Sequence, residues 1–390
     1  MTQLSVGYVP LLDAAPLIIA QELGFAAEEG LDLDLRAAPS WSSVRDMLNF
    51  GAVDAAHMLS PVPIAASLGL GGHAVPMSAV SVLSANGTVI GVTNALAEKM
   101  RGAGYTFDFN DAAVAGRALI AASATPLRIG VPFPFSMHSE LLIYWLNALG
   151  LPAPQNVDIK TVPPSLMGKA MRMGEIDAFC VGEPWGSLAV EQGLGTLLLA
   201  GASIWSFSPE KVLAMRSDWA EVNPALRNQL IRAVVRAGRW LSEPASLTVA
   251  SEILARPSYL NVPADILDRG LTGQFVISPQ GERRSQSSFV IFHGGATQYP
   301  WTSQAEWIAL QLARRTGLDR EQSQSAASSV FRGDLFRDAL AGSGMDVPLE
   351  ARKVEGGFAA PQDVDSGFGR LSLLPNQFFD RRIFNPNTSE

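Results

Sequence analysis

His138 and Lys211 are two residues whose chemistry could serve the binding of a small anion. His138 follows Ser136, a good N-cap residue for a helix that the apolar spacing predicts over 137–149. Free backbone N–H groups and the positive end of the helix dipole favour an anion at such a helix start. A lysine ammonium would add a compact positive charge. The alternative interpretations are a structural histidine and an ordinary surface lysine.

The sequence contains no constellation that is typical of an enzyme. Neither a G-x-S-x-G nucleophile elbow nor a glycine-rich phosphate loop occurs. Cys180 is the only cysteine, and its apolar neighbours indicate a buried small hydrophobe rather than a nucleophile. His57, His73 and His293 lack a second histidine or carboxylate at metal-ligand spacing. We therefore predict a binding protein without a cofactor or metal.

Length and charge restrict the class of protein further. The chain has 390 residues, of which 47% are hydrophobic and 17% are charged, so it can bury more than one core. Its net charge of −8 includes no basic block, which argues against a nucleic-acid-binding surface. No apolar run reaches the roughly 20 residues that span a bilayer. The start MTQLSVGYVP has no features of an export signal, so we expect a cytoplasmic protein.

An internal repeat defines the elements that must position these residues. The stretch FGAVDAAHMLSP (50–61) reappears as MGEIDAFCVGEP (173–184), and four of its residues recur 123 positions later. The same offset relates LSVG (4–7) to LRIG (127–130). Each copy alternates apolar strands with helices, which predicts two α/β lobes, each a mostly parallel sheet flanked by helices. Ligands bind beyond the carboxyl ends of such strands, so we expect a cleft between facing lobes.

The turn GEPW (182–185) follows the last strand of the second copy and would lie at the rim of this cleft. Gly182 would let the backbone turn, and Pro184 could open the next helix. The alternative is a purely structural turn in which Glu183 caps or pairs locally.

Two extended segments, GTVIGV (87–92) and KVLAMR (211–216), flank the second copy and are predicted to cross between the lobes. Residues 1–90 and 211–390 would then form lobe one, and residues 91–210 an inserted lobe two. A hinge of two extended segments permits closure around a ligand. Further helices are predicted over 224–243, 303–316 and 327–342, and 346–375 is expected to be irregular.

Several stretches resemble the nitrate and bicarbonate group of periplasmic-binding-protein-like receptors, the family of the NrtA and CmpA solute-binding proteins. They are DAAHMLSPVP (54–63), NGTVIGV (86–92), MHSELLIYWLNALG (137–150), MGEIDAFCVGEPWGSLAVEQGLG (173–195), IWSFSPEK (204–211) and FFDRRIFNPN (378–387). The resemblance implies a two-lobed type II fold with two interlobe crossing strands. It also implies nitrate or nitrite as the ligand.

In having no export signal at its start, the sequence resembles the cytosolic NasS-type sensors. This likeness implies a partner, a NasT-type antiterminator protein with an RNA-binding ANTAR domain, which is released when nitrate binds. The competing hypothesis is a receptor that delivers an oxyanion to a membrane permease. Pyrimidine-synthesising enzymes share the architecture, but their metal-linked histidine and cysteine motifs are not evident here.

The resemblance also implies a set of ligand-binding residues. Lys211 takes the position of the family's nitrate-binding lysine, whereas bicarbonate receptors use an acidic residue with a metal there. Because nitrate carries one charge, we expect a single compensating cation with few carboxylates nearby. The other candidates are His138, Thr88, Gly87, Trp41 and Met58. Transport members have a glutamine where this chain has Thr88. For Trp41 and Met58 the alternative is packing in the core.

Overall fold

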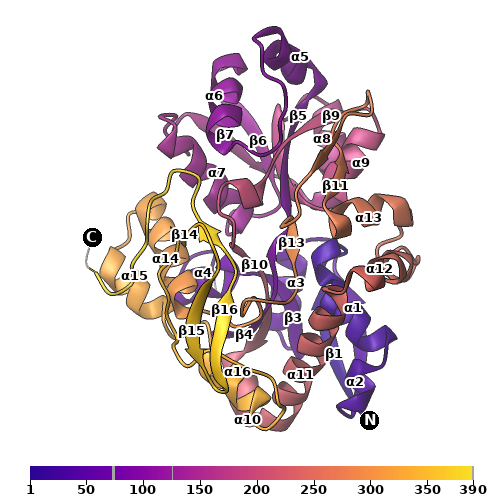
Figure 1. Ribbon diagram of the computed structural model, residues 1–390, viewed down its shortest axis with the longest axis vertical. Helices are drawn as coiled ribbons and strands as arrows, with labels where there is room; N and C mark the ends of the chain where they lie inside the picture. Colours follow the sequence, from indigo (N-terminus) through magenta and orange to yellow (C-terminus); the bar gives the residue numbers. More distant parts are fainter. Residues whose placement is uncertain (73–74, 125, 389–390) are drawn as a thin grey trace.

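The computed structural model describes residues 1–72, 75–124 and 126–388, and it contains two lobes that are each built on one sheet (Figure 1). The lower lobe in Figure 1, lobe one, has six strands in the order β13-β4-β10-β3-β1-β2. Their bounds are β1 Thr2–Tyr8, β2 Leu31–Ala37, β3 Ala55–Leu59, β4 Met77–Asn86, β10 Pro209–Arg216 and β13 Val290–Ile291. The upper lobe, lobe two, has five strands in the order β7-β6-β8-β5-β9. Their bounds are β5 Thr88–Thr93, β6 Leu127–Val131, β7 Val157–Thr161, β8 Ala178–Gly182 and β9 Gly195–Ala200.

Both sheets are mixed, which corrects the prediction that they are mostly parallel. In lobe one β1 runs parallel to β2 and β3, whereas β10 is antiparallel to β3 and β4. In lobe two β6 runs parallel to β7 and β8, and β5 is antiparallel to β8 and β9. The parallel part of each sheet is the repeated strand–helix–strand unit. The antiparallel part consists mainly of the strands through which the chain enters and leaves each lobe.

The internal repeat is confirmed by equivalent contacts in the two lobes. In lobe one the Asp54 carboxylate accepts a hydrogen bond from the Ser5 backbone N–H at 2.9 Å. In lobe two the Asp177 carboxylate accepts one from the Arg128 backbone N–H at 3.2 Å. Each aspartate precedes the third strand of its unit and accepts a hydrogen bond from the backbone of the first.

Helices cover both faces of each sheet. In lobe one they are α1 Ala15–Glu22, α2 Phe25–Glu28, α3 Trp41–Asn49, α4 Pro61–Ser67, α10 Ser217–Val222, α11 Pro224–Leu241, α12 Leu247–Leu254, α14 Thr302–Thr316, α15 Arg320–Ala327 and α16 Gly333–Leu340. In lobe two they are α5 Asn94–Gly102, α6 Ala112–Ala122, α7 Met137–Ala148, α8 Met167–Arg172 and α9 Trp185–Glu191. Helix α13, Ala264–Thr272, contacts α9 of lobe two and the short helix η1, Leu12–Ala14, of lobe one. The predicted helices over 137–149, 224–243 and 303–316 are confirmed as α7, α11 and α14.

The C-terminal third differs from the prediction at two places. The helix expected over 327–342 is interrupted, because the backbone between α15 and α16 bonds to strand β4 instead. Ala79 N–H donates to Val330 O at 2.9 Å, and Arg332 N–H donates to Ala79 O at 2.9 Å. The segment 346–375, expected to be irregular, contains β14 Gly357–Phe358 and the hairpin of β15 Gln362–Ser366 with β16 Gly369–Leu373. Figure 1 shows this hairpin in yellow against lobe one.

The chain passes between the lobes at more places than the two predicted crossings. It leaves the first sheet at Gly87, whose φ of 101° suits glycine. All of β5 therefore lies in the second sheet. The predicted lobe boundary at 90–91 would divide this strand. Strand β11 Gln274–Val276 pairs with β12 Arg283–Ser285 beside lobe two, where Leu197 N–H donates to Ile277 O at 2.7 Å. Near the C-terminus, Phe379 N–H donates to Ile204 O on the returning segment at 2.9 Å. Parts of 211–390 therefore bind to lobe two.

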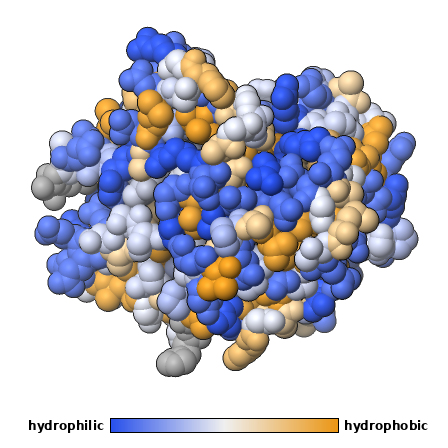
Figure 2. Space-filling model, turned by 90° about the horizontal axis from the view of Figure 1, so that it is seen from below, coloured by the Kyte–Doolittle hydropathy of each residue, from blue (hydrophilic) through white to orange (hydrophobic). Residues whose placement is uncertain are grey.

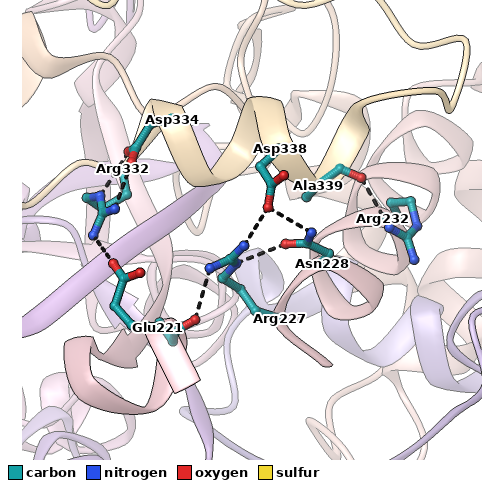
Figure 3. A network of polar contacts seen from close by, with 9 residues as sticks. Glu221, Arg227, Asn228, Arg232, Arg332, Asp334, Asp338 and Ala339 are labelled. Carbon is teal, nitrogen blue, oxygen red and sulfur yellow. Dashed lines mark hydrogen bonds and ion pairs between the residues drawn. The ribbon is translucent and has the colours of Figure 1, made fainter. Parts of the chain in front are cut away.

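The outer face of lobe one is held by a network of ion pairs and hydrogen bonds between α10, α11 and α16 (Figure 3). Arg227 donates to the Asp338 carboxylate at 2.7 Å and to Ala220 O at 2.9 Å. Arg332 pairs with Glu221 and Asp334, each at 2.7 Å. Every nitrogen of the Arg227 guanidinium donates a hydrogen bond, so this network serves the structure of the lobe.

Seen from below, hydrophilic residues cover much of the surface, and hydrophobic residues form small separate groups (Figure 2). Within the described ranges, no helix combines the length and the apolar character that crossing a bilayer requires.

Candidate functional site

Lys211 lies between the lobes and is completely buried. Its Nζ is 2.7 Å from Asp13 Oδ2 and 2.8 Å from Glu210 Oε1, and it lies 5.3 Å from the centre of the Trp41 ring. The register between β10 and β4 shifts on both sides of Lys211. Successive side chains of a regular strand point to opposite faces, but such an irregularity can turn two neighbours toward the same site. The ammonium and the Glu210 carboxylate meet for this reason.

Two histidines extend this group from other elements. His57 on β3 places Nε2 at 3.1 Å from Asp13 Oδ1, and its ring is 5.2 Å from that of Trp41. His138 in the first turn of α7 places Nδ1 at 3.3 Å from Glu210 Oε1. His138 belongs to lobe two, whereas the other members belong to lobe one. We call Asp13, Trp41, His57, His138, Glu210 and Lys211 the interlobe cluster.

Two helix starts position members of this cluster. The Ser136 hydroxyl accepts a hydrogen bond from the Ser139 backbone N–H at 3.2 Å, which confirms the predicted N-cap of α7. The Ser40 hydroxyl does the same for α3, accepting from Ser43 N–H at 3.2 Å. Both caps follow the ends of strands, and they place His138 and Trp41 in the first turns of their helices.

Burial and the central ammonium set the protonation of the cluster. Burial would raise the pKa of Asp13, but Lys211 and His57 outweigh it and hold that pKa below its usual value. Burial raises the pKa of Glu210 to about 7 against the opposing effect of Lys211. Burial also lowers the pKa of His138, and the Lys211 charge lowers it further. At neutral pH Lys211 and Asp13 are therefore charged and His138 is neutral. Glu210 is divided between its two forms.

The cluster contains polar atoms that the protein itself does not satisfy. Within the described residues, four buried atoms of the cluster have neither a hydrogen-bond partner nor an ion-pair contact: Trp41 Nε1, His57 Nδ1, His138 Nε2 and Glu210 Oε2. Buried polar atoms of native proteins are nearly always paired, so such a concentration calls for a polar guest. Donors around one ammonium suit a small anion.

The structure brings three of the six predicted residues together. Lys211, His138 and Trp41 belong to the cluster, and all are almost fully buried. Thr88 is the first residue of β5, and its hydroxyl packs against Gly201. A Cβ atom at position 201 would clash with the Thr88 hydroxyl. Gly87 forms the turn before it. The roles of these residues in binding a ligand stay predictions.

Met58 forms no polar contact with the cluster in the described part of the chain, so its role in binding stays a prediction. It pairs with Val212 across β3 and β10, and it belongs to the apolar core. Because its neighbour His57 points to the cluster, strand alternation turns Met58 to the opposite face.

Asp13, His57 and Glu210 are the members of the cluster that the sequence analysis missed. Asp13 and His57 each follow or end an expected strand, and Glu210 directly precedes Lys211, so their positions were the available signal. The expectation of few carboxylates near the cation was wrong, because Asp13 and Glu210 both contact Lys211. In the described part of the chain, no three histidine, cysteine or acidic side chains form a group that could hold a metal ion. His73 lies outside the described residues.

The lobes touch each other beside the cluster. Leu12 N–H of lobe one donates to Glu183 O of lobe two at 2.9 Å. The Glu183 carboxylate accepts from Ser187 N–H at 3.2 Å, so its side chain caps α9 locally, while the backbone of the GEPW turn lies at the lobe interface. Arg315 of α14 pairs with Glu140 of α7 at 3.0 Å on another side of the interface. The cluster is therefore enclosed by contacts between the lobes.

Comparisons with known proteins agree with this architecture. The model of the NMT1-like family matches residues 1–255. The nitrate/nitrite binding protein NrtA of Nostoc sp. is 32% identical over 369 residues, which cover 91% of this chain and 80% of that protein. The nitrate import ATP-binding protein NrtC of Synechocystis sp. is 32% identical over 390 residues, or 98% of this chain, and the match spans about half (53%) of that protein. The crystal structure of the periplasmic nitrate-binding protein NrtA from Synechocystis PCC 6803 superposes with a TM-score of 0.84 at 27% identity, covering 99% of this chain and 96% of that one.

Proposed function

Because this chain belongs to the NMT1-like family, and within it to the group of NrtA- and CmpA-like binding proteins, we propose that it binds nitrate or nitrite between its lobes. The observation that carries the proposal is the buried Lys211 ammonium in a cluster with four unpaired buried polar atoms. Nitrate offers three acceptor oxygens and one negative charge. Lys211 would neutralise that charge, while the Trp41 indole N–H and the Thr88 hydroxyl could donate hydrogen bonds.

The protein would act by binding and not by catalysis. His138 comes from lobe two and the other members of the cluster from lobe one, so a ligand between them would stabilise the closed arrangement. To move such an equilibrium from 1:99 to 99:1, the ligand must favour one state by about 5.5 kcal/mol. We propose that this closure is the signal that the protein transmits.

The finer proposal is a cytoplasmic sensor. In it, the ligand-free protein holds a NasT-type antiterminator and releases that partner when nitrate or nitrite binds. Its support is the resemblance to NasS-type sensors. The second candidate is a receptor that delivers the anion to an ABC importer, and the names of the relatives NrtA and NrtC favour it. Both candidates use the same anion site.

Calorimetric titration of the purified chain with nitrate, nitrite, bicarbonate, sulfate and chloride tests the binding proposal. Nitrate or nitrite should bind at one site per chain, and sulfate should not, because a doubly charged anion exceeds the single compensating cation. Absence of binding by both nitrate and nitrite would overturn it. Co-purification with a NasT-type protein that nitrate disrupts would support the sensor, whereas nitrate-dependent stimulation of a permease would support the receptor.

A further inference from the structure

Glu210 stands out among the charged groups of the interlobe cluster because its two oxygens have different surroundings. Oε1 accepts a hydrogen bond from Lys211 Nζ at 2.8 Å and lies 3.3 Å from His138 Nδ1. Oε2 is buried and has no hydrogen-bond partner within the described residues. The side chain has no exposed surface. One oxygen is therefore committed to the cation, and the other is free for a guest.

The charges of the cluster do not suit an anion if both carboxyl groups are ionised. Asp13 and Glu210 would contribute two negative charges, Lys211 one positive charge, and the neutral histidines none. The cluster would then carry a net charge of −1, and a bound nitrate would bring it to −2 without contact with water. Burying uncompensated charge costs several kcal/mol per ion, so one group should take up a proton.

We propose that Glu210 takes up a proton when the anion binds, and that its Oε2–H then donates a hydrogen bond to an anion oxygen. This inference rests on the proposed binding of nitrate or nitrite. The proton comes from solvent, no covalent bond other than O–H forms, and the proton returns to solvent on release. Glu210 would thus change from a group that repels the anion into a donor that selects for it.

The groups that face Glu210 leave it as the best proton acceptor. Asp13 from η1 contacts both Lys211 and His57, which hold the pKa of its carboxyl group down. His57 from β3 and His138 from α7 are buried, and burial lowers the pKa of both rings. The Cys180 thiol from β8 stays protonated because burial, together with the Glu210 charge, raises its pKa. The Glu210 carboxyl group, with a pKa of about 7, changes protonation near neutral pH.

Proton uptake can be measured directly. We would titrate the full chain with sodium nitrate at pH 8 in buffers that differ in ionisation enthalpy, at constant chloride. The dependence of the apparent binding enthalpy on the buffer gives the number of protons taken up. We expect close to one proton per nitrate at pH 8 and a small fraction at pH 6, where the group is already protonated. Above pH 7 the affinity should fall about tenfold per pH unit, as one linked proton requires.

Two variants assign the proton. Glu210→Gln presents an amide that can accept from Lys211 and donate to the anion, so it should bind nitrate with nearly constant affinity from pH 6 to 9 and without proton uptake. Glu183→Gln is the matched control. The Glu183 carboxyl group is also buried between the lobes with a pKa raised to about 7, but its partner is Ser187. This control should retain the proton uptake and the pH dependence.

Each outcome decides between the hypotheses. Nitrate binding without proton uptake at pH 8 would overturn the role of Glu210 and leave the proposed function standing. Uptake that persists in Glu210→Gln would assign the proton to another group, such as a histidine. Loss of uptake in Glu183→Gln would link the proton to lobe closure. The absence of nitrate binding at every pH would instead reject the proposed function itself. Circular dichroism and thermal unfolding would verify that both variants fold.

Discussion

The interlobe cluster and the network around Arg227 on the outer face of lobe one are both rich in charges, but they differ in how completely the charges are paired. Arg227 donates from all three nitrogens, and its partner Asp338 is 58% exposed, so water solvates the remaining carboxylate oxygen (Figure 3). Lys211, Asp13 and Glu210 are almost fully buried, and four polar atoms of their cluster have no partner among the described residues.

This difference separates a structural network from a site. A half-exposed, saturated network contributes modest stability and offers nothing to a ligand. A buried group with unpaired donors is costly for the folded protein, and a ligand that satisfies those donors recovers the cost. Incomplete pairing, not the density of charge, therefore marks the place to look for function.

The largest expected effect comes from removing the central cation. Lys211→Ala should weaken nitrate binding by about 100-fold or more, because no other cation contacts the cluster among the described residues. It should also lower the free energy of unfolding by about 3–5 kcal/mol at pH 8, since two buried carboxylates lose their partner. Calorimetry and urea unfolding measure the two effects. Lys211→Arg, which keeps the charge, is the matched control and should be more stable than Lys211→Ala. Equal nitrate affinity for Lys211→Ala and the native chain would contradict the interpretation of the interlobe cluster as the binding site.

A smaller effect should appear when the pH is changed without ligand. Glu140, Glu183 and Glu210 are buried at the lobe interface, and burial raises the pKa of each to about 7. A raised pKa contributes stability that is complete below the unfolded value of about 4.3 and is lost as the pH rises through 7. We expect the free energy of unfolding to fall by about 2 kcal/mol per group between pH 5.5 and 8, so by up to about 6 kcal/mol for the three. Urea unfolding of the native chain and of the double variant Glu183→Gln/Glu210→Gln measures this fall, and the double variant should lose less stability. Stability that rises between pH 5.5 and 8 would refute the raised pKa values of these glutamates.

The smallest effects belong to the outer network. Arg227→Met should lower the free energy of unfolding by about 1–2 kcal/mol, because Ala220 O loses a buried donor and Asn228 a partly buried one. Glu221→Gln, whose partner Arg332 keeps Asp334, should change it by about 0.5 kcal/mol or less. Neither variant should alter nitrate affinity. A loss of nitrate binding in Arg227→Met with an intact fold would show that the outer network and the cluster are coupled.

Much of the fold could be predicted because its signals are local or repeated. The 123-residue offset, the Ser136 cap and the apolar faces of α7, α11 and α14 each depend on residues close in sequence or on a duplicated unit. The interruption at 328–332 could not be predicted, because the backbone there bonds to β4, far away in the chain. The same holds for the hairpin of β15 and β16, whose short strands carry little periodic signal.

The sequence by itself determined two duplicated α/β units, the strand ends that face each other and the positions of Lys211, His138 and Trp41. Those features follow from periodicity and capping, which depend on residues close in sequence, and from the repeat, which presents the same local signals twice. Only the tertiary structure decided that Asp13 and Glu210 both contact Lys211, that Met58 faces the core and that Glu210 Oε2 has no partner. These contacts depend on the strand register, on an irregularity in β10 and on the distance between segments that are remote in sequence. Interactions between buried charges change steeply with such distances.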